Sequence, residues 1–385
     1  MMQMTEGSHA VAEAVRLCRP QVISAYPITP QTHIVEALAD FVANCKLDAE
    51  YITVDSELSA LSACVGASAA GSRTYSATTS QGLALMNEVC FNAAGMRLPI
   101  VMSIANRAMG APLSIWNDMQ DSISMRDAGW LQFYSEDNQE ATDLHFIAYK
   151  VAEDHSIQLP ALVCFDGFIL SHTYEPVDIL SQDDADRYLP KFAPAERLDA
   201  ADPISFGMYA TPEYYLEFRY EMDRAQKRAK EVIAKAGKEF GTLFGRDYSA
   251  LIEGYKIEDA ETAIVAMGSI CGTVKDAIDE MRADGKKVGL VKIRVFRPFP
   301  TEEIAKMLAH VKRVAVLDKN ISLGSKGATA LEVRDALYGT DGVSVKGYVL
   351  GLGGRDVRKR DIKAIVSLCE KGVGDQFYGL RQEVL

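Results

Sequence analysis

The segment ISAYPITPQT (residues 23–32) places a stiff turn between a short apolar run and a helical pattern. The apolar run ends at a tyrosine, and two prolines then bracket the dipeptide Ile28–Thr29. Proline fixes its own φ angle and drives the residue before it toward extended geometry, so neither proline suits the interior of a helix. The residues that follow, 31–45, space their apolar side chains as one face of a helix does. The segment therefore predicts a strand, a rigid turn and a helix, in that order.

The same alternation of strand and helix continues through the first 171 residues. Helical patterns such as residues 138–155 separate short runs that are rich in β-forming residues. This order predicts a mostly parallel sheet with helices on both faces. The six β-rich runs are QVISAYPI (21–28), EYITVDS (50–56), RTYSATT (73–79), LPIVMSIA (98–105), WLQFYSE (130–136) and PALVCFDG (160–167).

The alternation breaks after residue 171 and resumes near residue 258. Residues 178–203 are polar and contain several prolines, which is typical of a linker, and a charged helix is expected to follow over residues 212–238 and to end near Gly241. Strands and helices then alternate again with short loops. The predicted division is a first domain at 1–171, a linker and charged helix at 172–257, and a smaller α/β domain at 258–385.

The composition excludes several classes of protein. A net charge of −12 argues against binding to a nucleic-acid backbone, which takes clustered Lys and Arg. No apolar run approaches the ~20 residues of a membrane-spanning helix, and no signal peptide is recognisable, so we expect a cytoplasmic protein without membrane contact. The seven cysteines are scattered and the six histidines are isolated, which argues against a disulfide framework, an iron–sulfur cluster or a metal site held by this chain alone.

Polar side chains follow the predicted strands, where parallel α/β sheets bind ligands. Ser56 and Glu57 come after the second strand, and TTSQG (78–82) comes after the third. Both stretches also suit helix N-termini, where a hydroxyl caps the helix and a carboxylate meets the positive end of its dipole. Arg107 closes a strongly apolar strand, so it must pair with an anion or face a polar cavity. A structural ion pair and an anionic substrate explain this arginine equally well.

Several longer stretches together resemble the α subunit of 2-oxoacid:ferredoxin oxidoreductases. The resemblance extends over nearly the whole chain and keeps the order of the motifs, and residues 114–140 are most similar to the pyruvate:ferredoxin oxidoreductases. The stretches are AYPITPQT (25–32), residues 55–88, RLPIVMSIANRAMGAPLSIWNDMQDS (97–122), FYSEDNQEATD (133–143), residues 266–300 and LDKNISLGSKG (317–327).

The resemblance implies a fold, a reaction and a set of partners. The fold would be a pyrimidine-type thiamine diphosphate-binding domain followed by a domain like the C-terminal domain of transketolase. Such enzymes cleave a 2-oxoacid on thiamine diphosphate, pass the acyl group to coenzyme A and pass electrons through [4Fe-4S] clusters to ferredoxin. This chain lacks the G-D-G signature for the diphosphate and magnesium and lacks ferredoxin-like cysteine spacing. A β subunit would therefore hold the diphosphate and Mg²⁺, and γ and ferredoxin-like δ subunits would complete a dimer of heteromers.

The resemblance also assigns roles to individual residues. Glu57 matches the glutamate that hydrogen-bonds the aminopyrimidine ring of the cofactor, and Pro27 and Ile28 join it as cofactor-binding residues. Arg107 matches the arginine that binds the substrate carboxylate. Thr29 matches the threonine that contacts the substrate, and the prolines beside it would hold it in place with little entropy left to lose on binding. No residue of this chain is expected to bind a metal, and the isolated chain is expected to be inactive.

Three alternatives stay open. The same chemistry on 2-oxoisovalerate, 2-oxoglutarate or oxalate would use the same scaffold. The β chain of a lipoamide-linked 2-oxoacid dehydrogenase shares the order of domains, although YPITP (26–30) and NRAMGAP (106–112) disfavour it. In a non-catalytic scaffold subunit, the polar strand ends would only cap helices.

Overall fold

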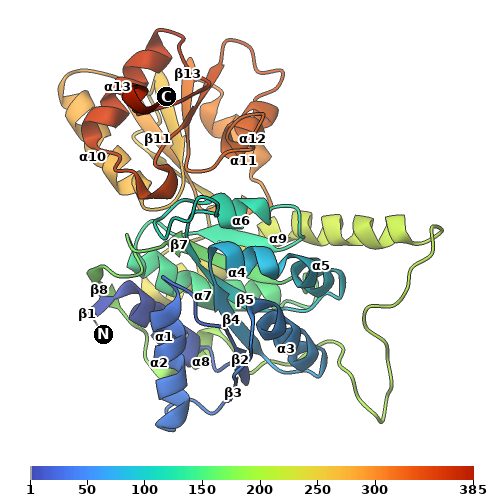
Figure 1. Ribbon diagram of the computed structural model, residues 1–385. Coiled ribbons are helices and arrows are strands. Elements are labelled where there is room, and N and C mark those ends of the chain that lie inside the picture. The colour runs from blue at the N-terminus through green and yellow to red at the C-terminus, as the bar shows by residue number, and fades with distance from the viewer. Residues whose placement is uncertain (1) are drawn as a thin grey trace.

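The computed structural model describes residues 2–385 and consists of two α/β units, one stacked on the other (Figure 1). The first unit is built on a seven-stranded sheet whose central strands β5 and β7 are buried along their whole length. Burial on both faces explains why these strands are continuous apolar runs. In sheet order the strands are β12 (Val295–Arg297), β6 (Leu131–Tyr134), β7 (Ala161–Asp166), β5 (Val101–Asn106), β4 (Thr74–Thr78), β2 (Val22–Ser24) and β3 (Glu50–Ile52).

Helices cover both faces of this sheet, as the alternating pattern predicts. On one face α1 packs against α2 and α7, and α7 packs against α9. On the other face α3 contacts α4 and α5. The bounds are α1 (Gly7–Leu17), α2 (Thr32–Ala43), α3 (Glu57–Ala69), α4 (Ser80–Leu85), α5 (Asn87–Gly95), α6 (Gln120–Ser124), α7 (Asn138–Ala152), α8 (Gln182–Tyr188) and α9 (Tyr215–Phe244).

The second unit is a six-stranded sheet that is parallel except for β9. Helices α10 and α13 pack together, as do α11 and α12. The strands, in sheet order, are β15 (Gln376–Phe377), β14 (Ser344–Val349), β13 (Arg313–Asp318), β10 (Thr262–Ala266), β11 (Val288–Ile293) and β9 (Ile252–Tyr255). The helices are α10 (Ile270–Ala283), α11 (Thr301–Leu308), α12 (Ala328–Ala336) and α13 (Lys359–Glu370), with short 3₁₀ turns at Leu352–Gly354 and Gln382–Val384.

The second unit contributes one strand to the sheet of the first unit, which the sequence pattern does not predict. The run VGLVKIRVF (288–296) looks like one strand, but it breaks at Arg294. Beyond that point β12 turns into the first sheet and pairs antiparallel with β6. Arg294 itself is buried and donates from Nε to Glu140 of α7 at 2.6 Å. A division of the chain at residues 171 and 257 therefore stays a proposal, because the first sheet takes its seventh strand from beyond both points.

The segment between the units is more ordered than a linker. It contains α8, and before it β8 (Tyr174–Asp178) pairs antiparallel with β1 (Met2–Glu6). The charged helix is present as α9, but it begins at Tyr215 and continues past Gly241 to Phe244. Gly241 lies within the helix, where Asp247 packs too closely for a side chain, and Gly245 takes the left-handed conformation, with φ of 78°, that ends the helix.

Within residues 2–385, no helix is both long and apolar enough to cross a membrane. All seven cysteines carry free thiols, and all except Cys45 are buried.

Candidate active site

The predicted site lies where strands β2, β4, β5 and β7 end side by side. Thr29 lies in the turn after β2, Gln81 in the first turn of the helix after β4, Arg107 directly after β5, and Gly167 directly after β7. Adjacent parallel strands bring these turns to one edge of the sheet.

The turn after β2 is held by the side chain of Gln31, which is fully buried. Its Oε1 accepts from the backbone N–H of Ile28 at 3.3 Å, and its Nε2 donates to the carbonyl of Ala77 in β4 at 2.6 Å. Pro30 packs so closely on Gly167 that a side chain there would come within 2.7 Å of the ring. The turn is therefore fixed from both sides, while Thr29 stays exposed to solvent.

Arg107 is buried, and within residues 2–385 no carboxylate lies within ion-pair distance of its guanidinium. The guanidinium instead donates to neutral oxygens, with Nη1 reaching the carbonyl of Thr29 at 2.7 Å and Nε reaching the carbonyl of Ser114 at 3.2 Å. Nη2 makes a longer contact of 3.4 Å to Oε1 of Gln81. Burial lowers the pKa of Arg107, but a guanidinium stays protonated because its ordinary pKa exceeds 12. The structure thus brings Thr29 and Arg107 together, with the Asp121 carboxylate nearby but no ion-pair partner for the guanidinium among residues 2–385.

Asp121, which the sequence analysis does not single out, positions this arginine. It is buried, and its carboxylate accepts from the backbone N–H of Arg107 and of Ser80, both at 3.0 Å. The side chain of Asn106 donates to its other oxygen at 2.8 Å. Burial raises the pKa of Asp121, and the N–H donors oppose that shift. Asp121 therefore ties the turn after β4 to the turn after β5.

Glu57 begins α3 and is 8% exposed. Its side chain lies over Gly82 in α4, where an added Cβ would come within 2.8 Å of Glu57 Oε1. No hydrogen bond from another residue in the described range 2–385 occupies the carboxylate. Glu57 thus presents a carboxylate with free hydrogen-bonding capacity, in space that only glycine leaves open.

Two of the predicted helix caps have different outcomes. Ser56 does cap α3, because its hydroxyl accepts from the backbone N–H of Ser59 at 3.2 Å. Thr79 does not cap α4 through its side chain, so that prediction is wrong. Its hydroxyl donates to the carbonyl of Ala105 at 2.5 Å and ties β4 to β5.

The remaining predicted residues belong to the same turn as Thr29. Pro27 is exposed and Ile28 is half-buried, so both can contact a bound molecule. The aminopyrimidine half of thiamine diphosphate fits this edge, because Glu57 offers it an unpartnered carboxylate beside a glycine. The assignment of Pro27, Ile28, Thr29, Glu57 and Arg107 to particular contacts stays a prediction.

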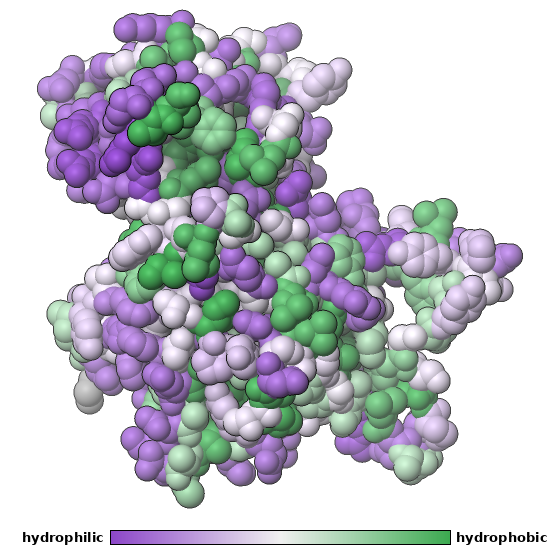
Figure 2. All heavy atoms as spheres, in the orientation of Figure 1, coloured by the Kyte–Doolittle hydropathy of each residue, from purple (hydrophilic) through white to green (hydrophobic). Residues whose placement is uncertain are grey.

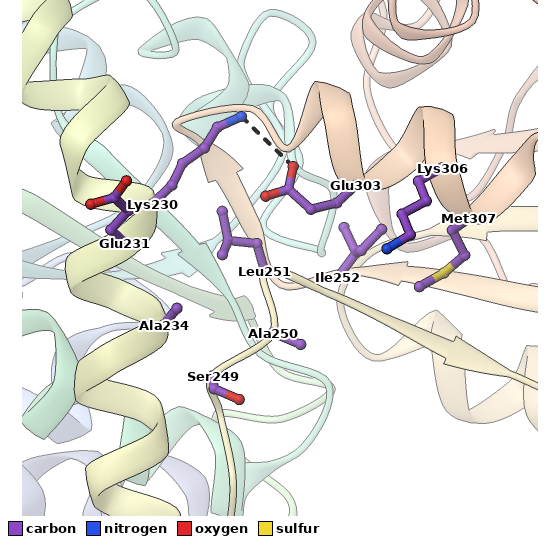
Figure 3. Close-up of a pocket in the computed structure, with 10 residues that line it drawn as sticks. All are labelled: Lys230, Glu231, Ala234, Ser249, Ala250, Leu251, Ile252, Glu303, Lys306 and Met307. Carbon is purple, nitrogen blue, oxygen red and sulfur yellow. Dashed lines mark ion pairs between the residues drawn. The ribbon is translucent and has the colours of Figure 1, made fainter.

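A hollow of about 580 Å³ lies elsewhere, between α9 and the elements β9 and α11 (Figure 3). An ion pair of 3.7 Å between Lys230 and Glu303 spans its rim. None of the predicted site residues lines it, and it contains no group that the proposed chemistry would use.

Comparisons with known proteins agree with this architecture. Residues 13–238 match the family model described as pyruvate flavodoxin/ferredoxin oxidoreductase, thiamine diphosphate-binding. Residues 260–362 match the model described as pyruvate:ferredoxin oxidoreductase core domain II. The fold class predicted from the sequence is therefore confirmed.

Curated relatives match along nearly the whole chain. Pyruvate synthase subunit PorA of Methanosarcina barkeri is 51% identical, over 100% of this chain and 98% of the relative. The protein of the same name from Methanothermobacter thermautotrophicus is 53% identical, over 96% of each chain. Ketoisovalerate oxidoreductase subunit VorA of Pyrococcus horikoshii is 50% identical, over 96% of this chain and 94% of the relative.

Two solved structures share the fold at low sequence identity. A 2-oxoglutarate:ferredoxin oxidoreductase from Magnetococcus marinus superposes with a TM-score of 0.73 at 19% identity, over 96% of this chain and 65% of that one. A split-gene transketolase superposes with a TM-score of 0.55 at 13% identity, over 94% of this chain and 98% of that one. With relatives about 50% identical over their full length and a family model spanning residues 13–238, the chain belongs to the pyruvate flavodoxin/ferredoxin oxidoreductase family.

Proposed function

We propose that this chain is the α subunit of a pyruvate:ferredoxin oxidoreductase. The complex would convert pyruvate and coenzyme A to acetyl-CoA and CO₂, reversibly, and pass the electrons to ferredoxin. The observation that carries the proposal is Arg107, a buried cation that neighbouring carbonyls hold in place and that forms no ion pair with any carboxylate of residues 2–385. A substrate carboxylate is the group that such a guanidinium fork recognises best.

Arg107 and Thr29 would bind and orient the 2-oxoacid. The contact between Nη1 and the Thr29 carbonyl sets the guanidinium against the turn after β2, so both residues face the same ligand. Asp121 fixes the backbone of Arg107, and Gln31 fixes the turn that carries Thr29. Because these contacts exist before any ligand arrives, little ordering would remain to be done on binding.

Glu57 would hold the aminopyrimidine ring and exchange a proton with it through a carboxyl oxygen. Thiamine diphosphate, when bound, supplies the nucleophilic carbon that makes decarboxylation of a 2-oxoacid possible. The contribution of this chain is to place Glu57 where Gly82 leaves room for it. Pro27 and Ile28 would pack against the same cofactor.

The other cofactor groups and the partners are part of the proposal. Thiamine diphosphate is shared with a β subunit that holds its diphosphate and Mg²⁺. The [4Fe-4S] clusters lie on partner subunits, and γ and δ subunits, ferredoxin and coenzyme A complete the system in the cytoplasm. The buried thiols of this chain support the assignment of the clusters to other subunits, because six of the seven cysteines pack inside the fold.

Pyruvate is the preferred substrate of the proposal, and 2-oxoisovalerate is the second candidate. Relatives named for each acid are about 50% identical to this chain. The test is reduction of a viologen dye by the complex purified through this chain, with pyruvate, 2-oxoisovalerate, 2-oxoglutarate and oxalate in parallel. Pyruvate should be strongly preferred in the presence of coenzyme A, and the isolated chain should reduce no dye. A preference for another acid would overturn the substrate, and turnover by the isolated chain would overturn the shared site.

Replacing Glu57 by Gln in the complex tests its proton-transfer role. The amide keeps the size of the side chain but cannot exchange a proton, so kcat should fall at least ~100-fold, the scale of a lost proton-transfer group. Glu36→Gln, at an exposed position of α2, is the matched control and should be neutral. Equal activity of the Glu57→Gln and Glu36→Gln complexes would favour a scaffold role for this chain.

A further inference from the structure

Three side chains far apart in the sequence meet outside the active-site turns. Glu6 ends strand β1, His33 lies in the first turn of α2, and His172 lies between β7 and β8. One ligand atom from each lies within 4.8 Å of the other two. We propose that Glu6, His33 and His172 form a binding site for one divalent transition-metal ion, with Zn²⁺ as its best-fitting occupant.

The spacing of the ligand atoms fits a single ion. Nδ1 of His33 lies 2.7 Å from Oε1 of Glu6, and Nδ1 of His172 lies 4.0 Å from the same oxygen. Ligands at ~2.0–2.2 Å from a zinc ion in tetrahedral geometry are a little over 3 Å apart, which lies between these two distances. The two rings lie 4.6 Å apart between centroids, so a small shift of each brings both nitrogens to one ion.

The charges around Glu6 also call for a cation. Its side chain is only 8% exposed, and within residues 2–385 every ion-pair partner of its carboxylate is a histidine, namely His33, His172 and, at 3.9 Å, His9. A buried carboxylate requires a compensating charge, which a divalent ion between Glu6 and the two imidazoles would supply.

The ligand types select the metal. Two imidazoles and one carboxylate are a common ligand set for zinc, and a fourth position open to solvent completes the tetrahedron. Ser171 Oγ lies 2.7 Å from Nδ1 of His172. Because Nδ1 is also the nitrogen that faces Glu6, an ion bound there would replace this hydrogen bond. His33 and His172 are partly exposed, so the ion has a path from solvent.

The isolated histidines predict no metal site in this chain, and the three ligands are indeed separated by 27 and 139 residues along the sequence. The fold joins them by pairing β1 with β8 and by starting α2 directly after the Thr29 turn. A bound ion would tie that helix to the segment after Gly167, on which Pro30 packs. A metal ion at this site would therefore hold two segments together beside the active-site turn. The proposed metal site does not depend on the proposed reaction.

The test uses the purified full-length chain, stripped with a chelator and titrated with Zn²⁺ against a chromophoric competitor. The wild type should bind one zinc ion per chain. The variants His33→Ala, His172→Ala and Glu6→Gln should each lower the affinity for zinc at least ~100-fold. His155→Ala is the matched control, because His155 is exposed and its Nε2 lies 2.9 Å from the carbonyl of Ala193, away from the three ligands. That variant should bind zinc as the wild type does.

Two readouts keep the test independent of any variant that folds poorly. Co²⁺ added to the wild type should give the visible absorption of a four-coordinate ion, and Zn²⁺ should displace it. Zinc should also raise the melting temperature of the wild type and of His155→Ala but not of Glu6→Gln, because an ion that binds only the folded chain stabilises it by mass action. Millimolar affinity in the wild type, or zinc binding unchanged in the His33→Ala, His172→Ala double variant, would show a hydrogen-bonded cluster only and overturn the proposal.

Discussion

Arg107 shows how a few neutral contacts can prepare a charged side chain for a ligand. Each carbonyl that it contacts belongs to a different turn, so the guanidinium is held at 2.7 Å from Thr29 and 3.2 Å from Ser114 without an ion pair. A structural ion pair, which the sequence left as an equal alternative, is absent for Arg107 in the range 2–385. The remaining charge of this buried side chain is what makes an anionic ligand the better explanation.

Gly82→Ala should disable the site without touching a charged residue. The new methyl group would lie within 2.8 Å of Cγ and Oε1 of Glu57 and 2.4 Å from Oγ1 of Thr78, so the carboxylate must move. A displacement of ~1 Å can cost ~100-fold in rate, and we expect a loss of that order in viologen reduction by the complex.

Gly95→Ala is the control for this substitution. Gly95 ends α5, and no atom lies within 4 Å of an added Cβ. Alanine also favours helix, so this variant should keep full activity and equal or higher stability. Wild-type activity in Gly82→Ala would show that the position of Glu57 does not matter to the reaction.

Thr29 and Arg107 have an unusual local setting in the sequence, and their roles at the site stay predictions. Thr29 lies between prolines, and Arg107 ends an apolar strand. Gln31, Gln81 and Asp121 gave no such signal, since each is an ordinary polar residue next to a turn. Their roles come from contacts across the sheet, such as Gln31 Nε2 to the Ala77 carbonyl, which no local pattern contains.

At the level of elements, the sequence predicts the buried strands of the second sheet but does not predict that β12 leaves that unit and joins the first sheet. Apolar runs identify β10, β11 and β13 because each is buried on both faces. The run VGLVKIRVF (288–296) does not predict the break at Arg294, because a continuous strand can also carry one arginine that faces solvent. At the break, Arg294 pairs with Glu140 of α7. Burial disfavours the charge of Glu140, but Arg294 and Lys292 outweigh this and lower its pKa.

Helix α7 contains a buried base that should make stability depend on pH. His145 is fully buried between Oγ of Ser103, at 2.6 Å, and the carbonyl of Ala141, at 2.7 Å. Burial lowers its pKa from 6.5 to about 4. The unfolded chain therefore takes up a proton below pH ~6.5 while the folded chain stays neutral until pH ~4, so stability is full above 6.5 and is lost between these values at up to ~1.4 kcal/mol per pH unit.

Comparison with His145→Gln isolates this effect. At pH 7.5 the variant should be the less stable protein, because it loses a well-placed pair of hydrogen bonds. Its deficit should shrink as the pH falls from 6.5 toward 5, since glutamine does not titrate. The measurement is the midpoint of urea unfolding at a series of pH values, and a gap that stays constant would show that His145 does not control this slope.

At the scale of the molecule, the second unit supports the loop that carries the site. Gly353 donates its backbone N–H to the carboxylate of Asp118 at 3.0 Å, and Met119 donates to the carbonyl of Lys319 at 2.8 Å. Asp118 and Met119 directly precede α6, which contains Asp121. An apolar core also runs from α3 and α5 into α11 and α12 without interruption. The second unit therefore supports the loop that leads to Asp121, whose carboxylate holds the backbone of Arg107.

One part of the molecule stands clear of both units. The start of α9 and the segment before it form an arm that projects from the body (Figures 1 and 2). The buried stripe of α9 starts only at Met222, and in the two turns before it every residue except the half-buried Arg219 is exposed. Large side chains on this arm are exposed, namely Met208, Tyr209, Tyr214, Tyr215, Leu216, Phe218 and Tyr220. Clustered exposed aromatic residues are typical of the centres of protein interfaces.

We expect this arm to hold a partner subunit of the proposed complex. Changing Tyr215, Leu216 and Tyr220 together to Ser should leave the fold intact, because none of the three is buried, and should weaken binding of the partner at least ~100-fold, as loss of an aromatic hot spot does. The measurement is the set of subunits that purify with a tag on this chain. Leu323→Ser with Tyr338→Ser is the control, since these side chains are 89% and 92% exposed but lie on the second unit. A docking role predicts that the arm variant loses partner subunits while the control variant keeps them. If both variants purify with the complete complex, the exposed arm does not contribute to assembly.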